Sequence, residues 1–210
     1  KWSYSYTLGE KHIGLSNNFK IAAVVLAAGA STRMGEPKQL LPWKSTTLLN
    51  HCLNEVVQAE LHQTSVVLGA YHEKIQSTIN QANIQCLINK NWKTGMGSSI
   101  ALVSQALKNK DIDGLLIVLA DQPFVNTNYL DILLKEFRPK NKQIIATDYT
   151  NTIGGPAIFD KYYFEELSLL KEKQGAKKLI HQYTQNVIKI IPDFNHQDID
   201  TPEEYRHLYN

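Results

Sequence analysis

The chain has 210 residues, of which 43% are hydrophobic and 20% are charged, and its formal net charge at pH 7 is +2. These values are ordinary for one globular domain. So small a charge argues against a nucleic acid or a membrane surface as the partner. No apolar run approaches the roughly 20 residues of a membrane span, and residues 1–18 lack the apolar core of a secretory signal. We therefore expect a cytoplasmic protein with a local binding site.

The cysteines and histidines show no spacing typical of a metal or redox site. The two cysteines, Cys52 and Cys86, lie in apolar runs without a CxxC pair, which predicts buried thiols in a reducing compartment. The seven histidines form no HxxxH or HExxH arrangement, which argues against zinc.

Short β-rich runs alternate with segments of helical period up to residue 137. Strands are predicted at residues 21–27, 65–69, 84–88 and 114–120, and helices at residues 47–59, 72–80, 98–107 and 126–137. Asn126 or Thr127 is expected to cap the last of these helices. The alternation predicts an α/β fold with a Rossmann-like, mostly parallel sheet and helices on both of its faces.

The pattern changes beyond Arg138. Short strands are predicted at residues 143–146 and 157–159, on either side of Gly154-Gly155-Pro156. Further helices are predicted at residues 162–170 and 176–183, and a further strand at residues 187–191. A terminal helix is predicted to begin at Thr201-Pro202-Glu203. Because no linker or repeat interrupts it, we expect a single domain at residues 19–210. Residues 1–18 are interpreted as a leader or tag whose role is open.

A long loop of small residues, 26–38, follows the first predicted strand and carries Arg33 and Lys38. In open α/β sheets ligands bind beyond the carboxyl ends of the strands, and small residues let backbone N–H groups approach phosphate oxygens. Two familiar phosphate motifs fail on spacing, because Gly29 and Gly35 do not precede a Lys-Ser/Thr pair as in a Walker A motif, and no GxGxxG occurs. The alternative is a glycine-rich connection with two exposed basic residues.

This loop resembles the signature LAAGxSxRMGxxKxLLP of the molybdenum cofactor cytidylyltransferase family. The agreeing positions are Leu26, Ala27, Ala28, Gly29, Ser31, Arg33, Met34, Gly35, Lys38, Leu40, Leu41 and Pro42. Later segments agree in the same order: Asn91-Trp92 through Gly95-Met96-Gly97-Ser98-Ser99-Ile100, Leu119-Ala120-Asp121-Gln122-Pro123, Gly154 with Pro156, Gly175-Ala176, and Asp198-Ile199-Asp200-Thr201-Pro202-Glu203. The resemblance covers about residues 20 to 208.

The resemblance implies a fold of the nucleotide-diphospho-sugar transferase type and a nucleotidyltransferase domain at residues 19–210. Such an enzyme transfers CMP from CTP to the molybdopterin-bound molybdenum cofactor and releases pyrophosphate, with Mg²⁺ as its cofactor. The implied catalytic residues are Arg33, Lys38 and Asp121, and the implied metal ligands are Asp121 and Asp200. The implied nucleotide-binding residues are Leu26, Ala27, Ala28, Gly29, Ser31, Arg33, Lys38, Gly95 and Ser98.

The residues themselves support parts of this set. Asp121 ends the most hydrophobic predicted strand, where a carboxylate is costly unless it is paired or binds a metal; the alternative is a helix N-cap. Asp200 precedes Thr201-Pro202 and is open to the alternative that it only caps the terminal helix. Asp198 is expected to be structural. Lys38 is expected to be exposed, so that replacing it by Ala changes stability by no more than about 0.5 kcal/mol.

Three departures from the family pattern fall on the side of the acceptor: Trp43-Lys44-Ser45-Thr46, Asn151 and Glu172-Lys173-Gln174. The acceptor therefore has alternatives, a sugar or alditol phosphate, and a guanylyltransferase acting on the same cofactor is a further one. Another class is a non-catalytic carrier that delivers the cofactor to a molybdenum hydroxylase, but a carrier needs no metal-binding carboxylate.

CTP is expected to be preferred over GTP, because the guanylyl branch reads LAGG and the methyl of Ala28 leaves less room for a purine.

Overall fold

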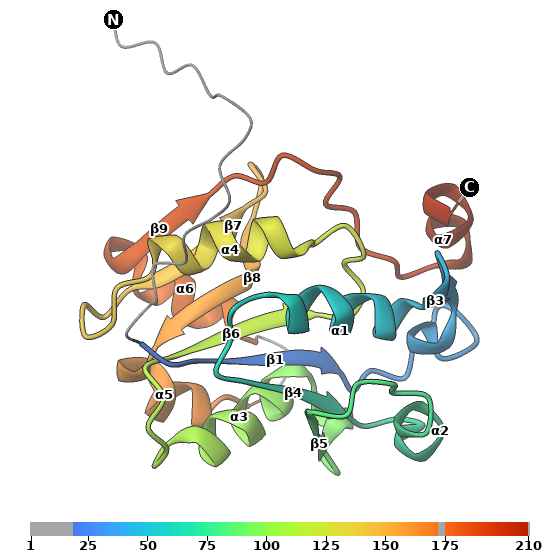
Figure 1. Ribbon diagram of the computed structural model, residues 1–210, viewed down its shortest axis with the longest axis horizontal. Coiled ribbons are helices and arrows are strands. Elements are labelled where there is room, and N and C mark those ends of the chain that lie inside the picture. The colour runs from blue at the N-terminus through green and yellow to red at the C-terminus, as the bar shows by residue number, and fades with distance from the viewer. Residues whose placement is uncertain (1–18, 172–174, 210) are drawn as a thin grey trace, which may run out of the picture.

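The computed structural model describes residues 19–171 and 175–209. The leader, residues 1–18, and the departure at residues 172–174 lie outside the described residues. One seven-stranded sheet forms the centre, in the order β5-β4-β1-β6-β8-β7-β9 (Figure 1). Its strands are β1 (Ile21–Ala27), β4 (Gln63–Leu68), β5 (Ile84–Ile88), β6 (Gly114–Leu119), β7 (Ile144–Asp148), β8 (Ile153–Asp160) and β9 (Val187–Ile190).

The remaining elements cover this sheet or extend its loops. A separate hairpin consists of β2 (Pro42–Trp43) and β3 (Thr46–Thr47). The α-helices are α1 (Leu48–Gln58), α2 (His72–Gln76), α3 (Met96–Leu107), α4 (Thr127–Glu136), α5 (Phe164–Ser168), α6 (Lys177–Gln182) and α7 (Pro202–Tyr209). Short 3-10 helices are η1 (Lys38–Leu40), η2 (Trp92–Thr94), η3 (Lys161–Tyr163) and η5 (Thr184–Asn186). Within the described ranges, no helix has both the length and the apolar character that crossing a membrane requires.

The predicted mostly parallel sheet is confirmed. Strands β5, β4, β1 and β6 run parallel to one another, and β7 runs parallel to β9. Only β8 among the described strands of this sheet runs antiparallel to its neighbours, β6 and β7. Strand β1 is buried along its whole length, as expected for a continuous apolar run between two layers of helices.

Alternate side chains of β1 enter two separate cores, because successive residues of a strand point to opposite faces. Ala23 and Val25 pack with α1 and α4, whereas Val24 and Leu26 pack with α3, α5 and α6. Figure 1 shows α1 and α4 in front of the sheet and the other group behind it. Helices on both faces are therefore confirmed.

The two thiols differ in their surroundings. Cys52 is buried in the core beside α1, and burial raises the pKa of its thiol to about 12. Cys86 lies on the edge strand β5 and is only partly buried, so the prediction of a buried thiol is wrong there. An edge strand has a neighbour on one side only, which leaves its side chains less covered.

The strands predicted at residues 143–146 and 157–159 are present as β7 and β8, but Gly154-Gly155-Pro156 lie inside β8 and not between the two strands. Ala157 pairs with Ala146 and Gly154 pairs with Thr147, so that Gly155 and Pro156 bulge out of the ladder. A bulged residue donates no ladder hydrogen bond, and the missing N–H of proline is tolerated there. Strand β8 therefore continues through Pro156.

Two predicted helices are shorter in the structure. The helix expected at residues 72–80 ends at Gln76, where the hydroxyls of Ser77 and Thr78 donate to backbone carbonyls three residues earlier and compete with the helix. The helix expected at residues 162–170 is divided into η3 and α5. The cap of α4 is confirmed as Asn126, whose side chain accepts the backbone N–H of Tyr129.

The end of β4 meets the end of β1 so closely that only glycine fits at residue 69. A Cβ on Gly69 would lie 2.5 Å from Cβ of Trp92 and 2.6 Å from the carbonyl oxygen of Ala28. We expect Gly69→Ala to lower the free energy of unfolding by about 1–3 kcal/mol, the usual cost of overpacking. Urea unfolding measures this loss.

Gly29→Ala is the matched control, because a Cβ on Gly29 would meet no atom within 4 Å. Its free energy of unfolding should stay within about 0.5 kcal/mol of the original. Equal stability of the two variants would contradict the close approach of β1 and β4.

Candidate functional site

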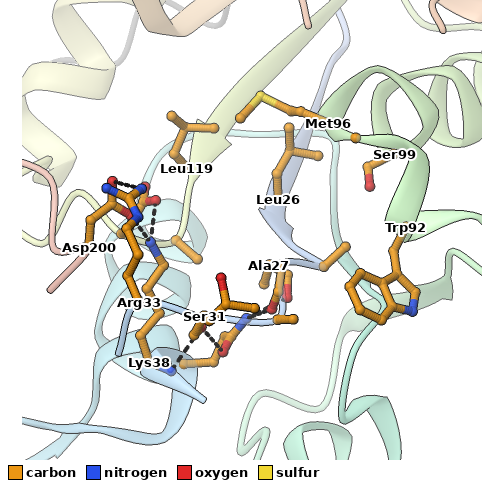
Figure 2. A pocket seen from close by; sticks show the side chains of 18 of the residues that line it. Leu26, Ala27, Ser31, Arg33, Lys38, Trp92, Met96, Ser99, Leu119 and Asp200 are labelled. Carbon is orange, nitrogen blue, oxygen red and sulfur yellow. Dashed lines mark hydrogen bonds and ion pairs between the residues drawn. The ribbon is translucent and has the colours of Figure 1, made fainter. Parts of the chain in front are cut away.

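A pocket of about 410 Å³ opens at the carboxyl ends of β1 and β6. The arginine–aspartate pair stands on one side, and Trp92 and Ser99 stand on the other (Figure 2). The pocket brings together almost all of the residues expected to bind nucleotide or metal: Leu26, Ala27, Ala28, Gly29, Ser31, Arg33, Lys38, Gly95, Asp121 and Asp200. Only Ser98 of the expected set does not line it. The volume lies within the usual range for small-molecule sites.

Lys38 connects three segments of the chain through one ammonium group. Its Nζ donates to Oδ2 of Asp121 at 2.8 Å, to Oδ1 of Asp200 at 2.8 Å and to the carbonyl oxygen of Ile199 at 2.9 Å. These contacts use all three N–H groups of the ammonium. Burial alone would lower the pKa of Lys38, but the attraction of Asp121 and the hydrogen bonds to both carboxylates raise it above its ordinary value.

Arg33 completes the pairing of Asp200. Its guanidinium donates to Oδ2 of Asp200 at 2.7 Å. Burial alone would raise the pKa of Asp200, but the hydrogen bond from Lys38, the charge of Lys38 and the charge of Arg33 lower it. Two cations therefore balance the two carboxylates, and Asp200 is ionised at neutral pH.

Asp121 provides the test of whether these residues suit a metal ion. Its Oδ1 is buried and has no hydrogen-bond partner. A buried carboxylate oxygen without a partner is costly and is suited to a cation. The described residues contain no group of three or more His, Cys, Asp or Glu side chains that could hold a metal. Mg²⁺ does not require one, since one or two carboxylates suffice where phosphates and waters supply the other ligands.

The alternative that Asp200 only caps the terminal helix is wrong. The hydroxyl of Thr201 accepts the N–H of Glu204 at 3.3 Å, and the carboxylate of Glu204 accepts the N–H of Thr201 at 2.8 Å. This reciprocal pair is a capping box. The carboxylate of Asp200 is thereby left for Lys38 and Arg33.

The cap alternative for Asp121 also fails, because the next helix, α4, begins at Thr127 and is capped by Asn126. Asp198 accepts a hydrogen bond from the side chain of Gln122 at 3.0 Å and does not line the pocket. Burial, followed by the charge of Asp121, raises the pKa of Asp198. These contacts fit the structural role that we expect for Asp198.

The segment that carries Asp200 is held against the end of β6 by contacts that the sequence patterns do not indicate. The N–H of Ile199 donates to the carbonyl oxygen of Asp121 at 3.0 Å. The side chain of Ile199 is fully buried in a small cluster with Trp43 and Leu48. The hydroxyl of Tyr205 donates to the carbonyl oxygen of Pro42 at 2.7 Å, which ties α7 to the β2–β3 hairpin. Trp43, one of the departures from the family pattern, thus positions Asp200.

Gln39 shapes the loop after β1 and is a second residue missed by the sequence patterns. Its side-chain amide donates to the carbonyl oxygens of Ala27 and Gly29, both at 2.9 Å, and the residue is 2% exposed. Ser31 has a φ of 53°, and its hydroxyl oxygen accepts the backbone N–H of Lys38 at 3.1 Å. The shape of the loop therefore rests on contacts within the protein.

Ser98 is placed outside the pocket, whereas its neighbour Ser99 lines it. The hydroxyl of Ser98 donates to the carbonyl oxygens of Asn91 and Gly95 and accepts the side-chain amide of Asn89. Consecutive residues of a helix point in directions about 100° apart, so the side chains of Ser98 and Ser99 lie in different surroundings. Gly95, which precedes α3, has a φ of 117° that favours glycine and does line the pocket.

The expectation that Lys38 is exposed is wrong, since 14% of its side chain is accessible. Lys38→Met should lower the free energy of unfolding at pH 7 by about 1–3 kcal/mol, because it leaves the part-buried carboxylate of Asp121 without its cation, whereas Asp200 keeps Arg33. Arg33→Gln is the matched control, because 67% of the Arg33 side chain is exposed. That change should stay within about 0.5 kcal/mol. Urea unfolding of both variants measures the difference, and equal effects would refute the bridging role of Lys38.

Comparison with known proteins places the chain in a family. The family profile described as MobA-like NTP transferase domain matches residues 23–187. Nicotine blue oxidoreductase from Paenarthrobacter nicotinovorans is 27% identical over 90% of this chain and 96% of its own length. A protein named probable molybdenum cofactor guanylyltransferase, from Bacillus mycoides (strain KBAB4), is 30% identical over 56% of each chain.

A solved structure agrees with this placement. Crystal structures of Rv0371c from Mycobacterium tuberculosis H37Rv include one with 30% identity and a TM-score of 0.81, covering 91% of this chain and 97% of that chain. Another, in complex with manganese, has 28% identity and a TM-score of 0.78, covering 91% and 98%. The chain belongs to the MobA-like NTP transferase domain family and is a nucleotidyltransferase.

Proposed function

We propose that this protein transfers CMP from CTP to the terminal phosphate of the molybdopterin-bound molybdenum cofactor and releases pyrophosphate. The observation that carries the proposal is the joining of Asp121 and Asp200 by Lys38, beside a loop of small residues at the carboxyl end of β1. Two carboxylates paired with two cations in one pocket suit a metal-bound triphosphate. The likeness to a molybdenum cofactor guanylyltransferase supports the acceptor.

The two sides of the pocket suit the two ends of a nucleotide. Trp92 and Ser99 offer uncharged side chains for the base on one side, and Arg33 with Lys38 offers cations for the phosphates on the other (Figure 2). Ala28 also lines the pocket. The backbone of Ala28 is held in place, because its carbonyl oxygen accepts the N–H of Ala70 at 3.1 Å. The base is therefore proposed to lie beside Ala28, with the α-phosphate toward Lys38.

The proposed transfer requires no side chain to act as a general acid or base. An oxygen of the acceptor phosphate forms a bond to the α-phosphorus, and the bond from that phosphorus to the oxygen bridging to the β-phosphate breaks. The second pKa of a phosphate monoester is about 6, so the nucleophile is largely ionised at neutral pH. The barrier lies in bringing two anions together and in stabilising the departing pyrophosphate, which calls for positioning and positive charge.

Lys38 and Arg33 supply that charge from the protein. Their contacts with Asp121 and Asp200 hold both side chains in the pocket before a substrate binds. Asp121 and Asp200 are the residues that would hold Mg²⁺, and the unpaired Oδ1 of Asp121 fits that role. When bound, a divalent ion would screen the negative charge of the triphosphate.

The same proposal includes a molybdenum hydroxylase as the protein that receives the finished cofactor. A sugar or alditol phosphate as acceptor, and a guanylyl donor, are the competing forms of the transfer. Pyrophosphate release from each of the four ribonucleoside triphosphates, measured with the molybdopterin cofactor, with a sugar phosphate and with no acceptor, distinguishes them. Release from CTP that depends on the cofactor supports the proposal, and release that requires a sugar phosphate contradicts it.

Asp121→Asn should fold and lower turnover by at least about 10², the scale seen when one electrostatic stabiliser of a transition state is removed. Asp198→Asn is the control, because it makes the same change in a neighbouring carboxylate that does not line the pocket. The oxygen of an asparagine there can still accept the hydrogen bond from Gln122, so turnover should stay near that of the original protein. Near-normal Mg²⁺-dependent turnover by a folded Asp121→Asn protein would remove Asp121 from the reaction.

CTP should be preferred over GTP by about 10- to 200-fold in kcat/KM, the range that one methylene in a pocket provides. Ala28 lines the pocket, and we propose that its methyl takes up room that a purine needs. Comparing kcat/KM for the two nucleotides with the same acceptor measures the preference. Ala28→Gly should narrow it. Equal values in the unaltered protein would refute the cytidylyl assignment and leave the nucleotidyltransferase unaffected.

A further inference from the structure

The two proposed metal ligands are already occupied by cations of the protein. Lys38 bonds Oδ2 of Asp121 and Oδ1 of Asp200, and Arg33 bonds Oδ2 of Asp200. Three of the four carboxylate oxygens thus have a charged donor, and the fourth, Oδ1 of Asp121, is buried without a partner. The two negative charges of the aspartates are balanced by two positive charges.

A divalent ion added to this arrangement would meet two positive groups within hydrogen-bond distance of its own ligands. Like charges this close disfavour one another strongly. Lys38 cannot simply turn into water, because its side chain is 14% exposed and all three N–H groups are bonded. Its release requires new acceptors inside the pocket, and the oxygens of a triphosphate are acceptors of that kind.

We propose that Lys38 and Arg33 occupy the carboxylates in place of the metal and exchange them for phosphate oxygens when a metal–triphosphate complex enters. The protein then binds a divalent ion weakly by itself and tightly together with the nucleotide. The exchange leaves no buried charge unpaired at either stage. This inference rests on the proposed function, since it assumes that Asp121 and Asp200 hold the metal of the metal–nucleotide complex.

The affinity for Mn²⁺ alone, measured without nucleotide by electron paramagnetic resonance of free Mn²⁺, tests the exchange. Lys38→Met should bind Mn²⁺ at least about tenfold more tightly than the unaltered protein, because one cation next to both carboxylates is removed. Arg33→Gln should show a smaller increase, since Arg33 contacts only Asp200. The same two variants should bind CTP more weakly.

Lys93→Met is the matched control. Lys93 also lines the pocket, but its ammonium lies 5.6 Å from the centre of the Trp92 ring and not on the carboxylates. This variant loses the same charge, and its affinity for Mn²⁺ should stay within about twofold of the original. An equal increase in Mn²⁺ affinity in Lys93→Met and Lys38→Met would mean that net charge alone causes the effect, and it would overturn the exchange.

The unaltered protein with Mn²⁺ and an unhydrolysable CTP analogue separates this inference from the proposed function. If the ternary complex forms while folded Lys38→Met and Arg33→Gln bind Mn²⁺ no more tightly than the original, the exchange is wrong and the metal site stands. If no Mn²⁺ binds even with the analogue, both the metal site at Asp121 and Asp200 and the exchange are wrong. Arg33→Gln keeps the test valid if Lys38→Met does not fold, because 67% of the Arg33 side chain is exposed.

Discussion

The ammonium of Lys38 is bonded at once to the end of β6 and to two residues of the segment before α7, and it is itself carried by the loop after β1. This single charge is shared by parts of the chain that are distant in sequence, and it joins them in one site. A part-buried ammonium is costly without such partners, and part-buried carboxylates are costly without such a cation. The ammonium of Lys38 and the carboxylates of Asp121 and Asp200 therefore stabilise one another in their part-buried positions.

Around this contact the fold supplies a rigid frame. Strands β1 and β6 are neighbours and parallel, so that the loop after β1 and Asp121 come to the same edge of the sheet. The cluster of Trp43, Leu48 and Ile199 brings the segment of Asp200 to that edge from the C-terminal part of the chain. The loop is shaped by Gln39, and the approach of β4 to β1 is set by Gly69. The geometry of the proposed site therefore depends on residues other than the paired carboxylates and cations.

The family contains proteins with different names, and a nearly full-length relative is named as an oxidoreductase. A shared fold hosts several functions, so the reaction must be inferred from the site. In this chain the site contains two carboxylates paired with Lys38 and Arg33, beside a loop of small residues. That set is the chemistry of phosphate and metal binding, and it agrees with the nucleotidyltransferase family to which the chain belongs.

The sequence by itself determined the layered α/β fold, because the period of apolar residues records which faces of strands and helices are buried. It also determined the loop after β1 and the place of Asp121, since both are local features of a strand end. Only the tertiary structure decided that Asp200 faces Lys38, that Lys38 is enclosed and that Ser99 lines the pocket in place of Ser98. These facts depend on contacts between distant segments and on side-chain direction, which local periodicity does not encode.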